Sequence, residues 1–369
     1  MKKLTLSNGI EILYLQNSSA KTVYLEAGFG VGLFSPEGKK QQIPHILEHL
    51  ILRDFRSKNG EFRKNGKTNN LLTTFSFEST DKSFEKTLSH FISLFKNLNF
   101  SESDLQIQKN IVKNELLSLA ASKNPAVYKE ILKNQNIPVL TIQKEIETLK
   151  KIEKNDVLGF YKKFFTTKNL RILIIGNFDE KIITKAFENL NLPCGNPILA
   201  QNFKLKNAEI SKSQQNLKFY TQIFTLNCSL SQIERITAEI ILIEIQTRLH
   251  QKMRQNGLVY NLSVIFSEGS VLDNSIFAIE SKINNENLAK FQEIIKTEIS
   301  KIRQIDEEDF ENAKRKLQNN LIFKMQTPAQ IAQKQRIRFL TYGDFIDFET
   351  NLDKIKIKDF QKLAKKFFS

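Results

Sequence analysis

The chain has 369 residues, a formal net charge of +15 and 40% hydrophobic residues, which supply enough apolar material for two or three globular domains. No apolar run reaches the roughly 18 residues of a membrane span, so we expect no membrane partner. The two cysteines, Cys194 and Cys228, form no C-x-x-C pair, and no secretory signal is visible at the N-terminus. These features favour a reducing, cytoplasmic location.

The positive charge has two interpretations. It could attract an anionic partner such as nucleic acid or acidic peptides. The lysines, however, are spread along the chain, and no nucleic-acid-binding fingerprint is present. The abundance of Lys, Asn, Ile and Phe is also what an AT-rich genome produces. We therefore expect no specific nucleic-acid partner.

The first elements are expected to be strands followed by a helix. Asn8-Gly9 separates two apolar runs and predicts a hairpin, and 23–27 reads as a third strand. Pro44 has no N–H to donate and is tolerated in a first helical turn, so a helix should begin close to it. The polar stretch 59–70 predicts a loop.

The rest of the chain alternates helices and strands. Ser101 is a plausible N-cap of one long helix. Apolar spacing predicts further helices at 84–95, 156–165, 180–190, 233–253, 286–302, 307–322, 329–340 and 358–368, and strands at 71–77, 170–175, 217–226, 260–266 and 276–280.

The sequence contains an internal repeat. The pattern that runs from Ile152 to Phe165 recurs from Ile355 to Phe368, 203 residues later in each case. Both halves follow the order strands, helix, strands, helices, which predicts two similar α+β domains. We place them at 1–195 and 213–369, joined by a linker at 196–212.

The most specific motif is H-x-x-E-H at His45-Ile46-Leu47-Glu48-His49. Residues four apart lie on one helix face, so His45 and His49 can hold one zinc ion. Glu48 is placed to take a proton from a water on that zinc, as peptide hydrolysis requires. The alternative interpretation is that the two histidines lie on a half-buried helix face and bind no metal.

A third ligand is needed to leave one zinc position open for catalysis. Glu115, on the helix that Ser101 begins, is one of several candidate carboxylates. Gln108 lies two turns earlier on a similar face. The second half has no H-x-x-E-H, and Asn320 corresponds to Glu115, so we expect only the first half to carry the metal.

Together these motifs resemble the pitrilysin/insulinase family of zinc metallopeptidases, the inverzincins that include mitochondrial processing peptidase. The resemblance covers nearly the whole chain, and the similar segments are 43–50, 66–73, 111–115, 170–177 and 247–260. It implies two homologous α/β-sandwich domains, mainly antiparallel sheet with helices, in a clamshell arrangement.

The resemblance also implies a set of site residues. These are His45, His49 and Glu115 as ligands of one zinc ion per chain, Glu48 as general base, Asn70 as a substrate-binding residue, Gln108 beside a ligand histidine, and Arg254 and Tyr260 as catalytic residues of the second domain. Two departures from the family pattern stand out. The family usually has a glutamate where this chain has Gln108, and the Arg254–Tyr260 spacing is one residue shorter than usual.

The function that follows is zinc-dependent endopeptidase activity on peptides or unfolded polypeptide segments. The alternative is a non-catalytic partner subunit of a heteromeric peptidase. Such subunits usually lose the zinc motif, and this chain keeps it. The family fold implies a dimer, formed with a second copy or with a related chain.

Overall fold

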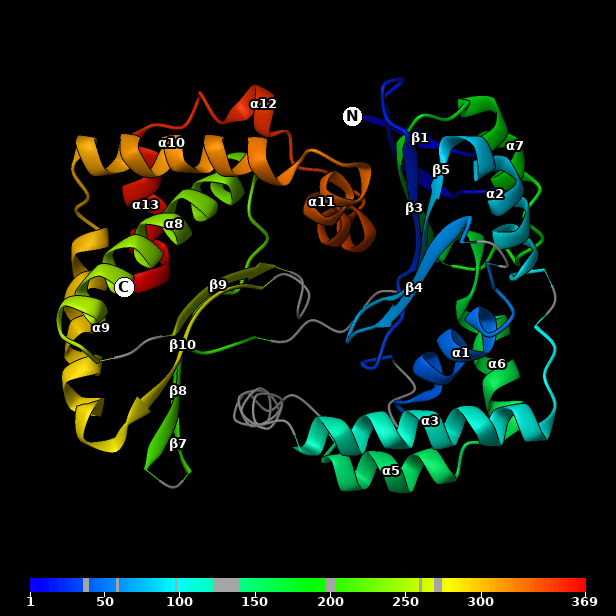
Figure 1. The fold of residues 1–369 in the computed structure, drawn as a ribbon, viewed down its shortest axis with the longest axis horizontal. Coiled ribbons are helices and arrows are strands. Elements are labelled where there is room, and N and C mark those ends of the chain that lie inside the picture. Colours follow the sequence, from blue (N-terminus) through cyan, green and yellow to red (C-terminus); the bar gives the residue numbers. More distant parts are fainter. Residues whose placement is uncertain are drawn as a thin grey trace. The chain divides into compact units, whose positions relative to one another are not determined.

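The structure is a computed structural model that describes residues 1–35, 40–57, 60–96, 98–121, 140–196, 204–214, 216–258, 261–268 and 274–369. It contains helices and two sheets (Figure 1), so the predicted α+β class is confirmed. None of the helices in these ranges is both long and apolar enough to cross a membrane.

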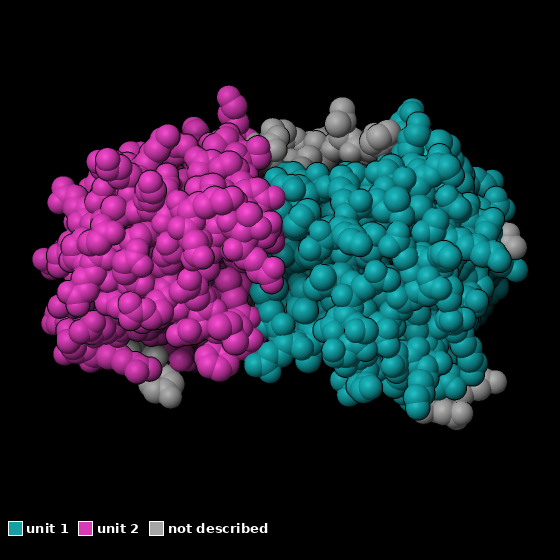
Figure 2. All heavy atoms as spheres, turned by 90° about the horizontal axis from the view of Figure 1, so that it is seen from above, with its two compact units in different colours: residues 1–122, 140–201, 325–345 teal, residues 123–139, 202–324, 346–369 magenta. Residues whose placement is uncertain are grey.

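The chain folds into two compact units, which Figure 2 colours separately. Unit 1 comprises Met1–Ser122, Leu140–Gln201 and Met325–Phe345, and unit 2 includes Asn202–Lys324 and Ile346–Ser369. The predicted continuous second domain at 213–369 is therefore wrong, because the segment 325–345 belongs to unit 1. The predicted linker at 196–212 is too long, because a strand of unit 2 already begins at Ala208.

Unit 1 is built on a six-stranded mixed sheet. Across the sheet the strands are β1 (Lys2–Thr5), β2 (Glu11–Gln16), β6 (Leu170–Gly176), β3 (Thr22–Phe29), β5 (Thr73–Thr80) and β4 (Phe62–Thr68). The predicted hairpin is present: Leu4 faces Ile12, and Gly9 takes a φ of +89°, which favours glycine. β6 runs parallel to β2 and antiparallel to β3.

Strand β4 occupies the stretch that we expected to be a loop. It is the last strand in the sheet order, and the side chains of Arg63, Asn65 and Lys67 are exposed. An edge strand tolerates such polar residues because solvent covers one of its sides. It consequently lacks the alternating apolar pattern by which a strand is recognised in sequence.

One face of this sheet packs against helices around a core rich in phenylalanine. The helices of unit 1 are α1 (Ile43–Leu52), α2 (Phe84–Ser93), α3 (Glu102–Ala121), α5 (Ile142–Lys150), α6 (Lys154–Phe164), α7 (Glu180–Glu188) and α11 (Pro328–Tyr342). Phe29 stacks on Phe165 with ring centroids 4.3 Å apart, and Phe75 meets Phe95 edge-on at 5.3 Å. This core fixes α1, and α3 packs against α1 in turn.

Helix α11 covers the opposite face of the same sheet, over β6 and β3 (Figure 1). Leu340 packs on Gly28 so closely that a Cβ at this glycine would lie 3.0 Å from the leucine Cδ1. Arg336 forms an ion pair with Glu26, whose side chain is 1% exposed. These contacts explain why a segment so late in the sequence belongs to unit 1.

Unit 2 contains an antiparallel sheet and five helices within the described residues. The strands, in sheet order, are β7 (Ala208–Gln214), β8 (Leu217–Leu226), β10 (Ser275–Asn284) and β9 (Leu262–Glu268), and the helices are α8 (Gln232–Gln255), α9 (Leu288–Ile302), α10 (Glu307–Lys324), α12 (Phe348–Asn351) and α13 (Ile357–Phe368). Their apolar side chains form a second, separate core.

Local contacts of unit 1 recur in unit 2. Lys109 of α3 donates a hydrogen bond to the carbonyl oxygen of Ile152 at 2.9 Å, just before α6 begins. Lys314 of α10 donates to the carbonyl oxygen of Ile355 at 3.2 Å, just before α13 begins. The same pair of helices is thus tied together in each unit, in agreement with the repeat seen in the sequence.

Candidate metal centre

The candidate centre is built on α1. Pro44 stands at the second position of this helix, so the histidine motif fills its first turns. Leu47 and Leu50 are buried in the core of unit 1, and His45 and His49 lie on the half-exposed side of the helix. The ring centroids of the two histidines are 4.8 Å apart. His45 and His49 therefore lie on the same face of α1, as their spacing predicts.

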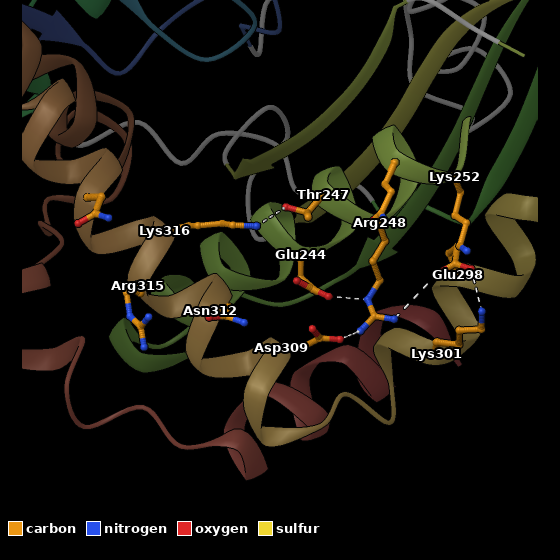
Figure 3. Close-up of a pocket in the computed structure, with 12 residues that line it drawn as sticks. Glu244, Thr247, Arg248, Lys252, Glu298, Lys301, Asp309, Asn312, Arg315 and Lys316 are labelled. Carbon is orange, nitrogen blue, oxygen red and sulfur yellow. Dashed lines mark hydrogen bonds and ion pairs between the residues drawn. The ribbon is translucent and has the colours of Figure 1, made fainter. Parts of the chain in front are cut away.

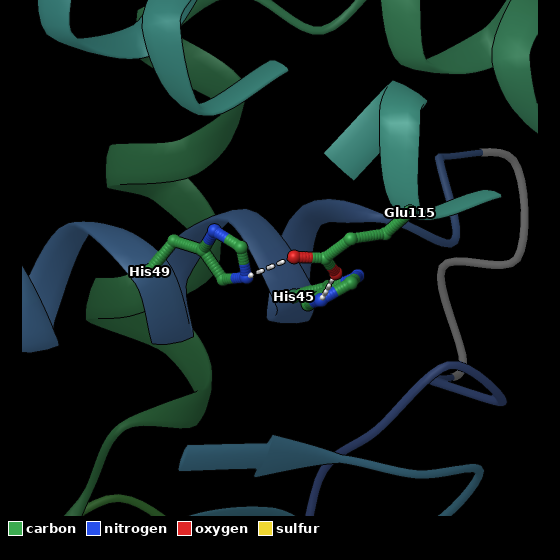
Figure 4. A group of neighbouring side chains, drawn as sticks. All are labelled: His45, His49 and Glu115. Atoms are coloured by element: carbon green, nitrogen blue, oxygen red, sulfur yellow. Dashed lines mark ion pairs between the residues drawn. The ribbon is translucent and has the colours of Figure 1, made fainter. Parts of the chain in front are cut away.

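Helix α3 brings a carboxylate to these histidines (Figure 4). Val112 and Leu116 are buried, and Glu115 between them projects from the helix edge with a side chain 50% exposed. Its Oε2 lies 3.2 Å from Nε2 of His45, and its Oε1 lies 3.7 Å from Nε2 of His49. Packing of α3 on α1 thus selects Glu115 among the candidate carboxylates.

The arrangement fits a zinc ion. The ligand atoms of His45, His49 and Glu115 all lie within 4.8 Å of one another, and no other group of His, Cys, Asp and Glu in the described ranges converges in this way. Ligands about 2.0–2.1 Å from a tetrahedral zinc lie roughly 3.3 Å from one another, and the two imidazole–carboxylate separations of 3.2 and 3.7 Å are close to this value. Two imidazoles and one carboxylate also leave a fourth position open.

Each histidine also has a hydrogen-bond partner on its other ring nitrogen. Nδ1 of His45 lies 3.1 Å from Oε1 of Gln42, and Nδ1 of His49 lies 3.3 Å from Oε1 of Gln108. Burial, helped by the charge of His49, lowers the pKa of His45 to about 4. This imidazole is therefore neutral at pH 7, which is the form that binds metals.

Glu48 faces β4 rather than open solvent, and the residue is 7% exposed. The hydroxyl of Thr68 donates to its Oε2 at 2.9 Å. A Cβ at Gly66 would lie 2.3 Å from its Oε1, so only glycine lets the strand pass this close. Burial raises the pKa of Glu48 to about 7; the Glu115 carboxylate adds to the rise, and Thr68 opposes it.

Of the three other predicted site residues, the structure describes two, each within its own unit. Asn70 is half-buried between β4 and β5, and its carbonyl oxygen accepts a hydrogen bond from the Phe34 N–H at 2.9 Å. Arg254 is exposed in the last turn of α8 in unit 2. Tyr260 lies outside the described residues. The centre as described therefore consists of residues of α1, α3 and β4, with Gln42 at the start of α1.

Three of its neighbours were missed by sequence reasoning. Thr68 and Gly66 lie in the polar stretch that predicts a loop. No sequence pattern therefore indicates that these two residues face Glu48. Gln42 had a usable signal, because it precedes His45 by three residues and the two side chains share a helix face.

Unit 2 offers a structural counterpart of this centre. The pair α1 and α3 in unit 1 corresponds to the pair α8 and α10 in unit 2, and an arginine–aspartate ion pair joins each. It is formed by Arg53 and Asp104 in unit 1, at 2.9 Å, and by Arg248 and Asp309 in unit 2. Counted from these pairs, the positions of His45, His49 and Glu115 correspond to Ile240, Glu244 and Asn320. Only one of the three is a plausible metal ligand.

That one residue, Glu244, is already engaged. It is buried and bonded to Arg248, which also approaches Glu298 and pairs with Asp309 (Figure 3). These side chains line a groove of about 570 Å³ between α8, α9 and α10. In unit 2 an ionic network thus occupies the region where unit 1 gathers its histidines.

Comparisons with known proteins find a peptidase family profile and a zinc-protease relative. Residues 151–317 match the family profile described as "Peptidase M16 inactive domain", a segment that begins after the histidines and Glu115. A Rickettsia felis protein described as an uncharacterized zinc protease is 23% identical over 394 residues, which cover 99% of this chain and 94% of the relative. Together these matches support the predicted membership of the pitrilysin/insulinase family of peptidases.

Solved structures share the fold of this chain. A chain of Complex III2 from Candida albicans superposes with a TM-score of 0.81 at 16% identity, covering 99% of this chain and 92% of that one. A protease from Helicobacter pylori gives 0.78 at 15% identity, covering 100% and 96%. These likenesses confirm the predicted fold and, at such identities, only the fold.

Proposed function

We propose that this chain is a zinc-dependent endopeptidase that hydrolyses peptides or unfolded polypeptide segments. His45, His49 and Glu115 hold one zinc ion per chain, and Glu48 is the general base. The observation that carries the proposal is the convergence of two imidazole nitrogens and a carboxylate beside a second, buried carboxylate. A structural ion pair would have no need of the second carboxylate.

When bound, zinc acts as a Lewis acid that lowers the pKa of water to roughly 7 and polarises the scissile carbonyl. Glu48 then removes a proton from the attacking water and passes it to the amine that leaves as the peptide bond breaks. In the metal-free protein burial raises the pKa of Glu48 to about 7, so this carboxylate accepts a proton more readily than an exposed one. Thr68 keeps its carboxylate pointed in one direction.

The competing function is that of a non-catalytic subunit in a heteromeric peptidase. The likeness to a chain of Complex III2 is the observation that favours it. The complete ligand set and a buried base favour the enzyme, because a purely structural subunit needs neither. We further propose a dimer, with a second copy or a related chain, and a cytoplasmic location, where the two exposed cysteines can remain reduced.

The proposal is tested with a quenched unfolded peptide and metal analysis. The purified chain should contain one zinc, lose hydrolysis on treatment with a chelator and regain it when zinc is restored. Glu115→Gln should lower zinc occupancy sharply, because a neutral amide is a weak zinc ligand. Full zinc occupancy in this variant would place the third ligand elsewhere, and hydrolysis that survives removal of zinc would refute a metallopeptidase.

A further inference from the structure

Gln42 stands at the N-cap of α1 without using its side chain as a cap. An N-cap side chain usually accepts a hydrogen bond from the N–H of the second or third helical residue. The second helical residue here is Pro44, which has no N–H. The amide of Gln42 instead meets His45, with its Oε1 3.1 Å from the imidazole Nδ1.

The position of this amide determines which ring nitrogen carries the proton. Gln42 is 2% exposed, and a buried polar group needs a hydrogen-bond partner. A carbonyl oxygen can only accept, so Nδ1 of His45 must donate to it. Nε2 then keeps its lone pair, and this is the nitrogen that lies 3.2 Å from Glu115.

We propose that Gln42 is a positioning residue that fixes His45 as the Nδ1–H tautomer and directs its Nε2 toward the metal. The inference rests on the proposed function, because the metal is its purpose. Gln108 stands in the same relation to His49, at 3.3 Å. Both partners are neutral amides, which orient an imidazole but make it less basic as a ligand than a carboxylate partner does.

The first test uses the metal-free protein and does not depend on zinc. The chain has only four histidines, so selective ¹⁵N labelling and single His→Gln variants assign each ring. The coupling pattern of His45 should show a proton on Nδ1 in the parent protein. In Gln42→Met, which keeps the side-chain length and the burial, both tautomers should appear. A proton on Nε2 in the parent would overturn the proposal.

The second test measures zinc affinity by competition with a chelator. Partners of ligand histidines commonly contribute about 10–100-fold to metal affinity, so Gln42→Met should weaken binding by about 10-fold or more. Gln42→Glu keeps an acceptor and should bind zinc at least as tightly as the parent. The matched control is Gln41→Met, which alters the adjacent buried glutamine and should leave the affinity unchanged.

The outcomes separate this inference from the proposed function. A parent protein that binds no zinc would defeat the proposed function, whatever the tautomer of His45. A parent that binds zinc, with Gln42→Met as tight as the control variant, would defeat only the role of Gln42. Melting temperatures of all three variants show whether a loss of affinity comes from loss of fold.

Discussion

Glu48 and His45 have opposite effects on how the stability of the metal-free protein changes with pH. The pKa of Glu48 is raised to about 7 from an ordinary 4.5, so the native state holds this proton more tightly and stability falls as pH rises through that window. The pKa of His45 is lowered to about 4 from 6.5, so its contribution rises with pH. The two largely cancel between pH 4.5 and 6.5.

The substitution Glu48→Gln separates these effects. Without zinc, the variant no longer buries a charge above neutral pH, so it should be more stable than the parent at pH 8 and lose this advantage near pH 5. The measurement is the free energy of unfolding in urea at both pH values. Added zinc should shrink the difference, because a nearby cation stabilises the charged carboxylate. A difference that does not change with pH would contradict the burial of Glu48.

The sequence predicts some residues of the centre and not others, for physical reasons. His45 and His49 can be recognised because a helix places residues four apart on one face, and Glu48 completes the same H-x-x-E-H motif. Glu115 is one of several carboxylates until α3 is packed on α1. Thr68 cannot be predicted, because its contact with Glu48 depends on a strand that lacks an apolar pattern.

At the scale of elements, the contact of α11 with the first sheet is the least predictable feature. The apolar spacing of α11 predicts a helix, but the sequence does not indicate which sheet this helix packs on. Arg336 and Glu26 are separated by 310 residues, and only the folded unit shows that they pair. Such long-range pairing depends on packing rather than on any local pattern.

Removal of this ion pair should destabilise unit 1. Arg336→Met leaves the Glu26 carboxylate, which is 1% exposed, without its counter-charge, and such losses cost about 3–5 kcal/mol. The double variant Glu26→Gln/Arg336→Met should recover part of this, because no charge is left buried. Hydrogen exchange of β3 and β6 amides under native conditions measures the change. Equal protection in the parent and the single variant would contradict the role of α11.

At the scale of the whole molecule, the repeat in the sequence correctly predicts two similar α+β units. Which residues belong to which unit is harder to predict. Chain order suggests two continuous domains, whereas 325–345 folds with unit 1. The half that carries the candidate metal centre is predictable from the motif alone. The counterpart in unit 2 shows the ligand positions replaced by Ile240, Glu244 and Asn320.

The second unit should nevertheless contribute to catalysis, as the family resemblance implies for Arg254 and Tyr260. Arg254→Ala and Tyr260→Phe should each leave the zinc content unchanged and lower turnover, by about 10²-fold if they stabilise the developing oxyanion. Lys252→Ala removes a charge two residues away on α8 and serves as the control. Parent rates in both variants would show that these two residues take no part.

The proposed function depends on Glu48 acting as the base of a zinc peptidase. Its most direct test is the turnover of a quenched unfolded peptide by zinc-loaded parent and zinc-loaded Glu48→Gln, with zinc measured on the same samples. We expect one zinc per chain in both and a loss of at least about 10²–10⁴-fold in turnover for the variant, because an amide cannot accept the proton. Near-parent turnover in Glu48→Gln, or no turnover in the zinc-loaded parent, would contradict it.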